Sequence, residues 1–419
     1  MPLLAAAPAA AVAWPWAVPF GLMLAAIAVM PLLAPHAWER NATKGVVALL
    51  CGLPPAIWAL AERPEALGHA AHEYAAFVAL LGALYVLAGG IFVDCDFRAT
   101  PRVNAAFLAT GAVLANLVGT TGAAMLLIRP LLHTNAERQH KVHTLVFFIF
   151  VVCNVGGCLT PLADPPLFLG YLEGVPFAWT LRLLPWWAAM NAALIAVYLV
   201  VDARAVRRET REALRLDAEV HVPLRVRGGW NFLLLAGVLA TVGLRVPSPF
   251  AEATILSLAF VSFVATPQSI HASNCFSWHP IVEVAVLFAG IFASMVPALE
   301  ILRAAGPDLG VSSPRSFFWA TGVLSGLLDN APTYLTFLNV ARGMEMPREV
   351  AGVSHEVLAA ISMGAVFMGA TTYIGNGPNF MVKAIAEARG VAMPSFVGYL
   401  RWTALVPLPL LALLSWAAF

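Results

Sequence analysis

Long apolar segments separated by short polar connections run along the whole chain. Many of them approach the length of about 20 residues that a helix needs to cross the hydrocarbon core of a bilayer. Clear examples are Ala17–Ala34, Ala75–Val93, Leu183–Val201, Trp230–Val246 and Pro394–Phe419. The pattern predicts an all-α polytopic membrane protein, with the lipid bilayer as its first partner.

Two of the apolar regions are interrupted in the same way. Residues 157–168 have the sequence GCLTPLADPPLF, and residues 369–380 have the sequence GATTYIGNGPNF. A shift of 212 positions superposes Gly157 on Gly369, Thr160 on Thr372, Asp164 on Asn376, Pro166 on Pro378 and Phe168 on Phe380. Helix breakers and polar residues at matching positions in the two halves of a membrane protein point to a transporter binding site.

The internal repeat extends beyond the two interrupted regions. Gly90-Ile91-Phe92 matches Gly290-Ile291-Phe292, and Ala109-Thr110-Gly111 matches Ala320-Thr321-Gly322, in the same order. The one long polar stretch, Asp202–Arg227, joins the halves and is predicted to be a loop or a short amphipathic helix. We therefore expect a first transmembrane repeat over residues 1–201, a basic linker over residues 202–227, and a second transmembrane repeat over residues 228–419.

Each half also holds one long apolar segment with a polar centre. These segments are Val103–Ile128, with Asn116–Gly122 at its centre, and Ser316–Val340, with Asp329–Thr333 at its centre. A continuous helix facing lipid would not place such residues at membrane depth. We interpret both segments as re-entrant hairpins that enter and leave on the same side, with a kinked full span as the alternative.

The distribution of Lys and Arg favours the hairpins. With hairpins, each half has about five transmembrane helices, and the cytoplasmic loops of the first half hold 14 basic residues against two outside, Arg63 and Arg182. If the first hairpin were a full span, the division would be 11 inside and 5 outside, which fits the positive-inside rule less well. Because five is odd, the second repeat is expected to be inverted, with a cytoplasmic linker and both termini outside. We expect the location to be a bacterial inner membrane.

The composition narrows the function. Hydrophobic residues make up 60% of the 419 residues, charged residues make up 11%, and the mean hydropathy is +0.81. The net charge of +1 argues against an electrostatic nucleic-acid binder, so no nucleic-acid partner is expected. The chain has no phosphate-binding loop, and we expect neither enzymatic activity nor a cofactor other than transported or coupling Na⁺ and H⁺.

The interrupted regions carry the candidate chemistry. A broken membrane helix exposes the positive end of one half-helix and the carbonyl oxygens of the other, which suit anions and cations respectively. The candidate ion- or substrate-binding residues are Asn154, Thr160, Asp164, Asp329, Asn330, Thr371, Thr372, Asn376 and Asn379. The hairpin and break backbone is expected to involve Gly119, Thr120, Thr121, Gly156, Gly157, Gly375 and Gly377.

Two carboxylates stand out among these candidates. An ionised carboxylate in hydrocarbon is expensive, so an intramembrane aspartate suggests a functional site, and we expect Na⁺ or a proton to bind near Asp164 and Asp329. The alternatives are that Asp164 caps the half-helix that starts at Pro165 and that Asp329 stabilises a turn. Lys383 is expected either to extend to the membrane interface or to serve as a counter-ion to one of the aspartates.

The motifs resemble those of the ion transporter superfamily, which includes NhaD-type sodium:proton antiporters, arsenite permeases and citrate- or dicarboxylate-type carriers. The segments that carry the resemblance are GGCLTPLADPPLFLG over residues 156–170, LLDNAPTYL over residues 327–335, and GATTYIGNGPNFMV over residues 369–382. The resemblance covers the whole chain in architecture and implies two inverted halves, each with a hairpin and a broken helix. It also implies a homodimer.

One departure from the superfamily bears on the substrate. The paired Ser-Asn-Thr signature of sodium-coupled dicarboxylate carriers is missing, since the hairpins have Gly119–Gly122 and Asp329–Pro332 instead. We therefore expect sodium (or lithium):proton antiport by alternating access. Cation-coupled transport of citrate or another small organic anion, an arsenite-type permease, and a channel or scaffold are the alternatives. His133, His140 and His143 are expected to lie in a solvated cytoplasmic loop.

Overall fold

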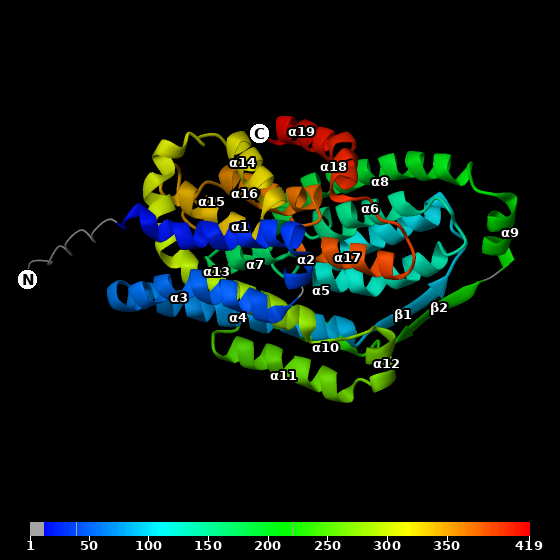
Figure 1. Ribbon diagram of the computed structural model, residues 1–419, viewed down its shortest axis with the longest axis horizontal. Helices are drawn as coiled ribbons and strands as arrows, with labels where there is room; N and C mark the ends of the chain where they lie inside the picture. The colour runs from blue at the N-terminus through cyan, green and yellow to red at the C-terminus, as the bar shows by residue number, and fades with distance from the viewer. Residues whose placement is uncertain (1–11, 39, 220) are drawn as a thin grey trace, which may run out of the picture.

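The computed structural model describes residues 12–38, 40–219 and 221–419, and most of them are helical (Figure 1). The first half contains α1 (Val18–Leu33), α2 (Pro35–Trp38), α3 (Asn41–Glu62), α4 (Pro64–Gly89), α5 (Pro101–Thr134), α6 (Val142–Phe150), α7 (Pro165–Leu172) and α8 (Leu184–Val206). Between the halves lie α9 (Arg211–Glu219) and the strand β2 (Val222–Arg227), which pairs with β1 (Phe92–Asp96). The second half contains α10 (Asn231–Gly243), α11 (Phe250–Ala265), α12 (Gln268–Ser273), α13 (His279–Ala305), α14 (Pro314–Leu327), α15 (Asn330–Arg342), α16 (His355–Met368), α17 (Gly377–Ala388), α18 (Phe396–Leu405) and α19 (Pro407–Ala418).

This architecture confirms the expected all-α polytopic membrane protein. Among the described residues, six helices or helical runs are long and apolar enough to cross a membrane, or seven if the bent pair α18 and α19 forms one span. The chain is therefore an integral multi-pass membrane protein. The expected position of the N-terminus concerns residues 1–11, which lie outside the described part.

The linker contains a short amphipathic helix, one of the two expected forms, and also a strand that was not expected. Helix α8 continues to Val206, α9 is the amphipathic helix, and residues 222–227 form a strand whose Val226 pairs with Val93 of β1. Residue 93 had been expected to end a membrane span, but α4 ends at Gly89. The alternation of Val222, Leu224 and Val226 is the period-two pattern that favours a strand.

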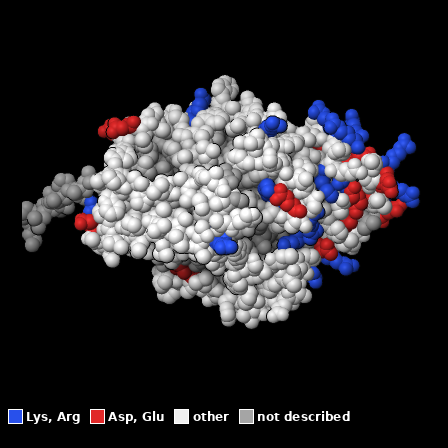
Figure 2. All heavy atoms as spheres, in the orientation of Figure 1, with Lys and Arg blue, Asp and Glu red and all other residues white. Residues whose placement is uncertain are grey.

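The two strands and α9 mark one polar end of the molecule. In Figure 2 the charged side chains gather over this end, at the right of the view, while most of the remaining face is uncharged. Within this end, Asp217 of α9 accepts a hydrogen bond from the Ala99 amide at 2.9 Å. Burial is the largest influence on this carboxyl and raises the pKa of Asp217 above its ordinary value.

The first long segment folds into a helical hairpin. Gly119 has φ 78° and ψ 157°, which breaks α5 near its middle, and a positive φ of this kind favours glycine. The side-chain amides of Asn104, near the start of α5, and Asn135, just after its end, donate to each other at 2.9 and 2.8 Å. Because its two ends are joined, α5 consists of two antiparallel arms with the tip at Gly119.

The second hairpin is formed by α14 and α15. The chain turns at Leu328 and Asp329, and Phe317 of the first arm packs edge-on against Phe337 of the second. The open end of this hairpin lies at the C-terminal end of α13, where the backbone of Gly343 is too close to the Arg303 carbonyl to admit a Cβ atom.

The open ends of the two hairpins lie at opposite ends of the molecule. Helix α13 starts beside the C-terminal end of α4, where Tyr85 donates to the Ser277 carbonyl at 2.9 Å, and β1 and the first hairpin follow α4 directly. Helix α13 has 27 residues and therefore spans about 40 Å at 1.5 Å per residue. Its far end, where the second hairpin opens, thus lies far from the open end of the first hairpin. The two tips therefore approach the middle of the molecule from opposite directions.

A buried polar network holds the open end of the first hairpin against α8. Asp202 accepts hydrogen bonds from Arg138 at 2.5 Å, His143 at 2.8 Å and Tyr198 at 3.0 Å. His143 had been expected in a solvated loop, but this expectation was wrong, because His143 lies in α6 and is buried. A buried carboxylate needs such partners, since burying an unpaired charge is expensive.

Replacing Arg138 with methionine should destabilise the protein by about 3 kcal/mol, because the substitution removes one partner of a buried ion pair. Thermal unfolding of the purified protein in detergent measures this loss. The matched control is Arg215→Met, which breaks the exposed Arg215–Glu219 pair and should change the unfolding temperature little. Equal shifts in the two variants would show that the buried network does not secure the hairpin.

Candidate functional site

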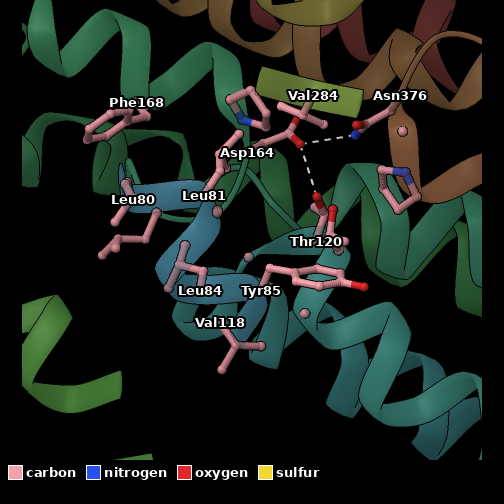
Figure 3. Close-up of a pocket in the computed structure, with 18 of the residues that line it drawn as sticks. Leu80, Leu81, Leu84, Tyr85, Val118, Thr120, Asp164, Phe168, Val284 and Asn376 are labelled. Atoms are coloured by element: carbon pink, nitrogen blue, oxygen red, sulfur yellow. Dashed lines mark hydrogen bonds between the residues drawn. The ribbon is translucent and has the colours of Figure 1, made fainter. Parts of the chain in front are cut away.

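The two hairpin tips and the two helix breaks meet at one cavity of about 130 Å³ (Figure 3). The polar segments that line it are residues 118–122, 161–165, 329–330 and 376–378. Apolar side chains of α4 and α13 form the opposite wall, with the lining completed by Leu80, Leu81, Leu84, Tyr85, Phe168, Pro280, Ile281, Val284 and Phe288. Polar groups from both halves of the chain therefore face one shared space.

Asp164 is the centre of this cavity's hydrogen bonding. Its side chain is only 2% exposed. Oδ1 accepts from the Thr120 hydroxyl at 3.1 Å and from Nδ2 of Asn376 at 3.0 Å, and Oδ2 accepts from Nδ2 of Asn330 at 2.6 Å. The three donors come from the first hairpin, the second break and the second hairpin. Asp164 and Asn376, the pair that the 212-residue shift superposes, are thus in direct contact.

Local sequence explains why this carboxylate is free to face the cavity. Asp164 occupies the N-cap position of α7, yet its side chain makes no capping hydrogen bond. Pro165 and Pro166 have no N–H groups, so the start of α7 offers fewer donors than an ordinary helix. Asp164 therefore does not cap α7, which was the alternative that the sequence suggested, and its carboxylate oxygens are directed to side chains from other segments.

Asp329 combines a structural role with a place in the cavity. It is the N-cap residue of α15, and its Oδ1 accepts from the Ala331 amide at 3.0 Å. This is the turn-stabilising role that the sequence suggested as the alternative. The residue also lines the same cavity as Asp164, so the cap and a role in the cavity are compatible.

Three helices begin at the cavity, and no fixed cation balances its carboxylates. Helices α7, α15 and α17 start directly after Asp164, Asp329 and Asn376, so their partially positive ends point to the same space. Among the described residues, no Lys or Arg lines the cavity. Lys383 pairs instead with Glu387 at 2.7 Å, so it is not a counter-ion to either aspartate.

The matched threonines lie behind the cavity and fasten each hairpin to its neighbouring break. Thr160 donates to the Asn116 carbonyl at 2.6 Å, and Thr372 donates to the Gly326 carbonyl at 2.6 Å. Each acceptor belongs to the first arm of the hairpin in the same half. A similar contact thus occurs twice, made by threonines that the internal repeat relates, and neither threonine lines the cavity.

The remaining candidates outside the cavity connect the two breaks. Asn154 donates to Oδ1 of Asn379 at 2.7 Å, and Asn379 donates to the carbonyls of Gly369 and Thr372. Four further candidates lie around the breaks and do not line the cavity. Gly156, Gly157 and Gly375 are packed too closely against neighbouring atoms to admit a Cβ atom, and the Thr371 hydroxyl donates to the Met368 carbonyl. By contrast, Gly119, Thr120, Thr121, Asn330, Asn376 and Gly377 line the cavity with the two aspartates.

Sequence reasoning missed the apolar wall from α4 and α13. Leu84 and Val284 contribute to it, but each is one aliphatic residue among many in a long, largely apolar helix, and neither belongs to a polar motif. Their role depends on which face of each helix turns to the hairpin tips, and this is set by packing between distant segments.

A helical multi-pass membrane protein whose paired hairpins and broken helices enclose a small polar cavity has the form of a secondary transporter. Residues 9–419 match the model of a family described as "Putative citrate transport". Because the match covers nearly the whole chain, the chain belongs to this family of citrate-transporter-like permeases. A search of curated proteins finds no match.

Replacing either matched threonine with valine should lower the stability, because each substitution removes the hydroxyl's bond to the hairpin carbonyl, at a cost of about 1 kcal/mol, while keeping the side chain's shape. Both variants should unfold at a lower temperature, and Thr372→Val should shift more than Thr160→Val, because the Thr372 hydroxyl also accepts from the Ile374 and Gly375 amides at 3.0 and 3.1 Å. Thr254→Val is the control, since the Thr254 hydroxyl is exposed and bonds only within its own helix. If only one of the two threonine variants were destabilised, the two contacts would not play the same structural role.

Proposed function

We propose that this protein carries a citrate-class organic anion across the membrane together with a coupling cation, by alternating access. The observation that carries the proposal is the buried Asp164 carboxylate, which receives donors from both halves of the chain. In the described part of the chain, no Lys or Arg lines the cavity beside it. Membership of the citrate-transporter-like family supports the choice of substrate class.

Coupling between the anion and a cation follows from the free-energy cost of the buried Asp164 charge. Moving an ionised carboxylate into a low-dielectric interior costs several kcal/mol unless a positive charge compensates it. Neutral donors such as Thr120 and Asn376 stabilise the carboxylate only in part. A bound proton or Na⁺ supplies the missing charge, and Asp164 and Asp329 are the groups in the cavity that can hold it. The loaded cavity then tolerates an anionic substrate better than the empty one.

The anion's own interactions come from neutral groups. The starts of α7, α15 and α17 present partially positive ends to the cavity, and hydroxyl and amide side chains add hydrogen-bond donors. The volume of about 130 Å³ suits a small ion or small carboxylate. Substrate and cation would therefore bind side by side, each reducing the electrostatic cost of the other.

Alternating access would use the two hairpins as opposing elements. Their open ends lie at opposite ends of the molecule, as the Asn104–Asn135 pair and the Gly343 contact indicate. Two inverted repeats would then expose the same cavity first to one side and then to the other. The charged end formed by α9 and the strands (Figure 2) would be cytoplasmic under the positive-inside rule.

Sodium (or lithium):proton antiport is the second candidate, favoured by the same acidic cavity without a fixed cation. In that mechanism Asp164 and Asp329 would bind Na⁺ and protons alternately, and no organic anion would be required. An arsenite-type permease shares the same architecture. Transport assays with each solute separate these alternatives.

Replacing Asp164 with asparagine should reduce cation-coupled citrate uptake by roughly a hundredfold, since the variant keeps the shape but loses the charge that binds the coupling cation. Proteoliposomes with an imposed Na⁺ or proton gradient and labelled citrate measure this. Asp308→Asn removes an exposed carboxylate and should transport like the unmodified protein.

The outcomes of this assay are distinct. Absence of citrate uptake under every cation gradient, together with collapse of a proton gradient on addition of Na⁺, would replace citrate transport with antiport. Citrate flux that ignores both gradients would indicate a channel. Normal coupled uptake by Asp164→Asn would remove Asp164 from the mechanism while leaving the substrate class intact.

Replacing Asp329 with asparagine separates its two roles. Asparagine caps a helix about as well as aspartate, so Asp329→Asn should fold normally, whereas Asp329→Ala should lose about 1 kcal/mol. If the charge of Asp329 contributes to cation binding, the asparagine variant should need roughly tenfold more coupling cation for half-maximal uptake. An unchanged cation dependence in a stable Asp329→Asn protein would restrict this residue to capping.

A further inference from the structure

A second cavity, of about 290 Å³, lies beside the first and has a different chemical character. It is enclosed by α4, the end of α7, the end of α10 and the start of α11. Its lining residues are His72, Ala76, Phe168, Tyr171, Leu172, Gly174, Val175, Thr241, Val242, Arg245, Val246, Ser248, Ala251, Glu252 and Ile255. Unlike the first cavity, it includes an arginine.

The order of residues along α4 places the second cavity on one side of the first. His72 and Ala76 line the second cavity, Leu80 to Tyr85 line the first, and α4 then ends at Gly89, directly before β1. The 17 residues from His72 to Gly89 span about 25 Å. Helix α10 runs in agreement with this placement, because it starts after β2 and lines the second cavity only with its last turn and the residues that follow it. The second cavity thus lies at the end remote from the charged strands.

An aromatic side chain separates the two cavities. Phe168 lines both of them. Its ring stacks on Phe77 at 6.5 Å, and Phe77 stacks on Phe288 at 4.5 Å, so the partition consists of three buried rings. Phe168 lies in the first turn of α7, four residues after Asp164, the residue that precedes the helix. A shift of α7 when Asp164 gains or loses its cation would therefore move Phe168.

The second cavity also carries charged groups without partners. Among the described residues, Arg245 forms no salt bridge, although Glu252 lines the same cavity. Oε2 of Glu252 is buried and has no hydrogen-bond partner. Arg245 adopts a positive φ of 55° in the short connection after α10, and the nearby Tyr171 hydroxyl donates to the Val242 carbonyl at 3.1 Å. A guanidinium that is not paired is well suited to a carboxylate, which it binds through two parallel hydrogen bonds.

We propose that this second cavity is an access vestibule on the side opposite the linker, in which Arg245 first binds a carboxylate of the substrate. Phe168 is the gate between this vestibule and the Asp164 cavity. The chemical class of ligand is a small di- or tricarboxylate, and this part rests on the proposed function. The position of the vestibule and the gating by Phe168 rest on geometry alone.

Cysteine labelling tests the vestibule. Cys275 is the one exposed cysteine among the described residues, so Cys275→Ser provides a background with low reactivity. In that background, Ala251→Cys should react with a membrane-impermeant, anionic methanethiosulfonate added from the side opposite the linker. Protease cleavage within α9 identifies the linker side of each vesicle preparation. Adding Arg245→Gln should slow the anionic reagent about fivefold and leave a cationic reagent unslowed, because one attractive charge is lost.

A second labelled position tests the gate. Leu84 lines only the Asp164 cavity, so Leu84→Cys should be protected from the same side while Phe168 is present. Phe168→Ala should increase its labelling rate at least tenfold, and Phe168→Leu offers a milder change if the alanine variant does not fold. Equal labelling of Leu84→Cys with and without Phe168 would overturn the gate. Labelling of Ala251→Cys only from the linker side would overturn the vestibule.

Citrate itself provides the last arm of the test. Citrate should slow labelling of Ala251→Cys, and Arg245→Gln should raise the KM for citrate uptake about tenfold with kcat unchanged, while Arg245→Lys should recover part of the loss. If citrate neither protects nor is transported, the proposed substrate is wrong, but the sidedness and Phe168 results still decide the vestibule and the gate. If citrate is transported yet Arg245→Gln leaves both protection and KM unaltered, Arg245 is not the first binding group.

Discussion

A carboxylate buried without a cationic partner governs the rest of this structure. Asp164 lies at the centre of the protein, and the groups that satisfy it are neutral: the Thr120 hydroxyl and the amides of Asn330 and Asn376. Such donors satisfy the oxygen lone pairs but leave the net charge uncompensated, which is expensive in a low-dielectric interior. A bound proton or metal cation would supply the missing charge, and this is the physical basis of the coupled transport that we propose.

The architecture brings those donors to one place. Each hairpin tip reaches the centre from a different end of the molecule, and Thr160 and Thr372 repeat the same contact between hairpin and break. The scaffold is thus nearly symmetric, whereas the charges are not, because Asp164 faces Asn376 across the repeat. Under the proposed function, a cation bound at Asp164 would compensate a charge that the second half does not carry at the matching position, Asn376.

Much of the polar part of the site could be predicted from the sequence, because Gly, Pro and charged residues in apolar segments are strong local signals. Asp164, Asp329 and Asn376 stand out for this reason, and all three line the cavity. What could not be predicted depends on contacts between distant segments. The pairing of β1 with β2 and the burial of His143 beside Asp202 leave no local pattern, and the α4 and α13 wall shares its composition with every other apolar helix.

The most direct test of the central claim is infrared difference spectroscopy of the purified protein as Na⁺ or protons are added in the presence of citrate. The account predicts a change in carboxyl or carboxylate absorption that disappears in Asp164→Asn and persists in Asp308→Asn. The same difference spectrum in Asp164→Asn as in the unmodified protein would contradict it, because the coupling cation would then be held by a group other than the buried carboxylate.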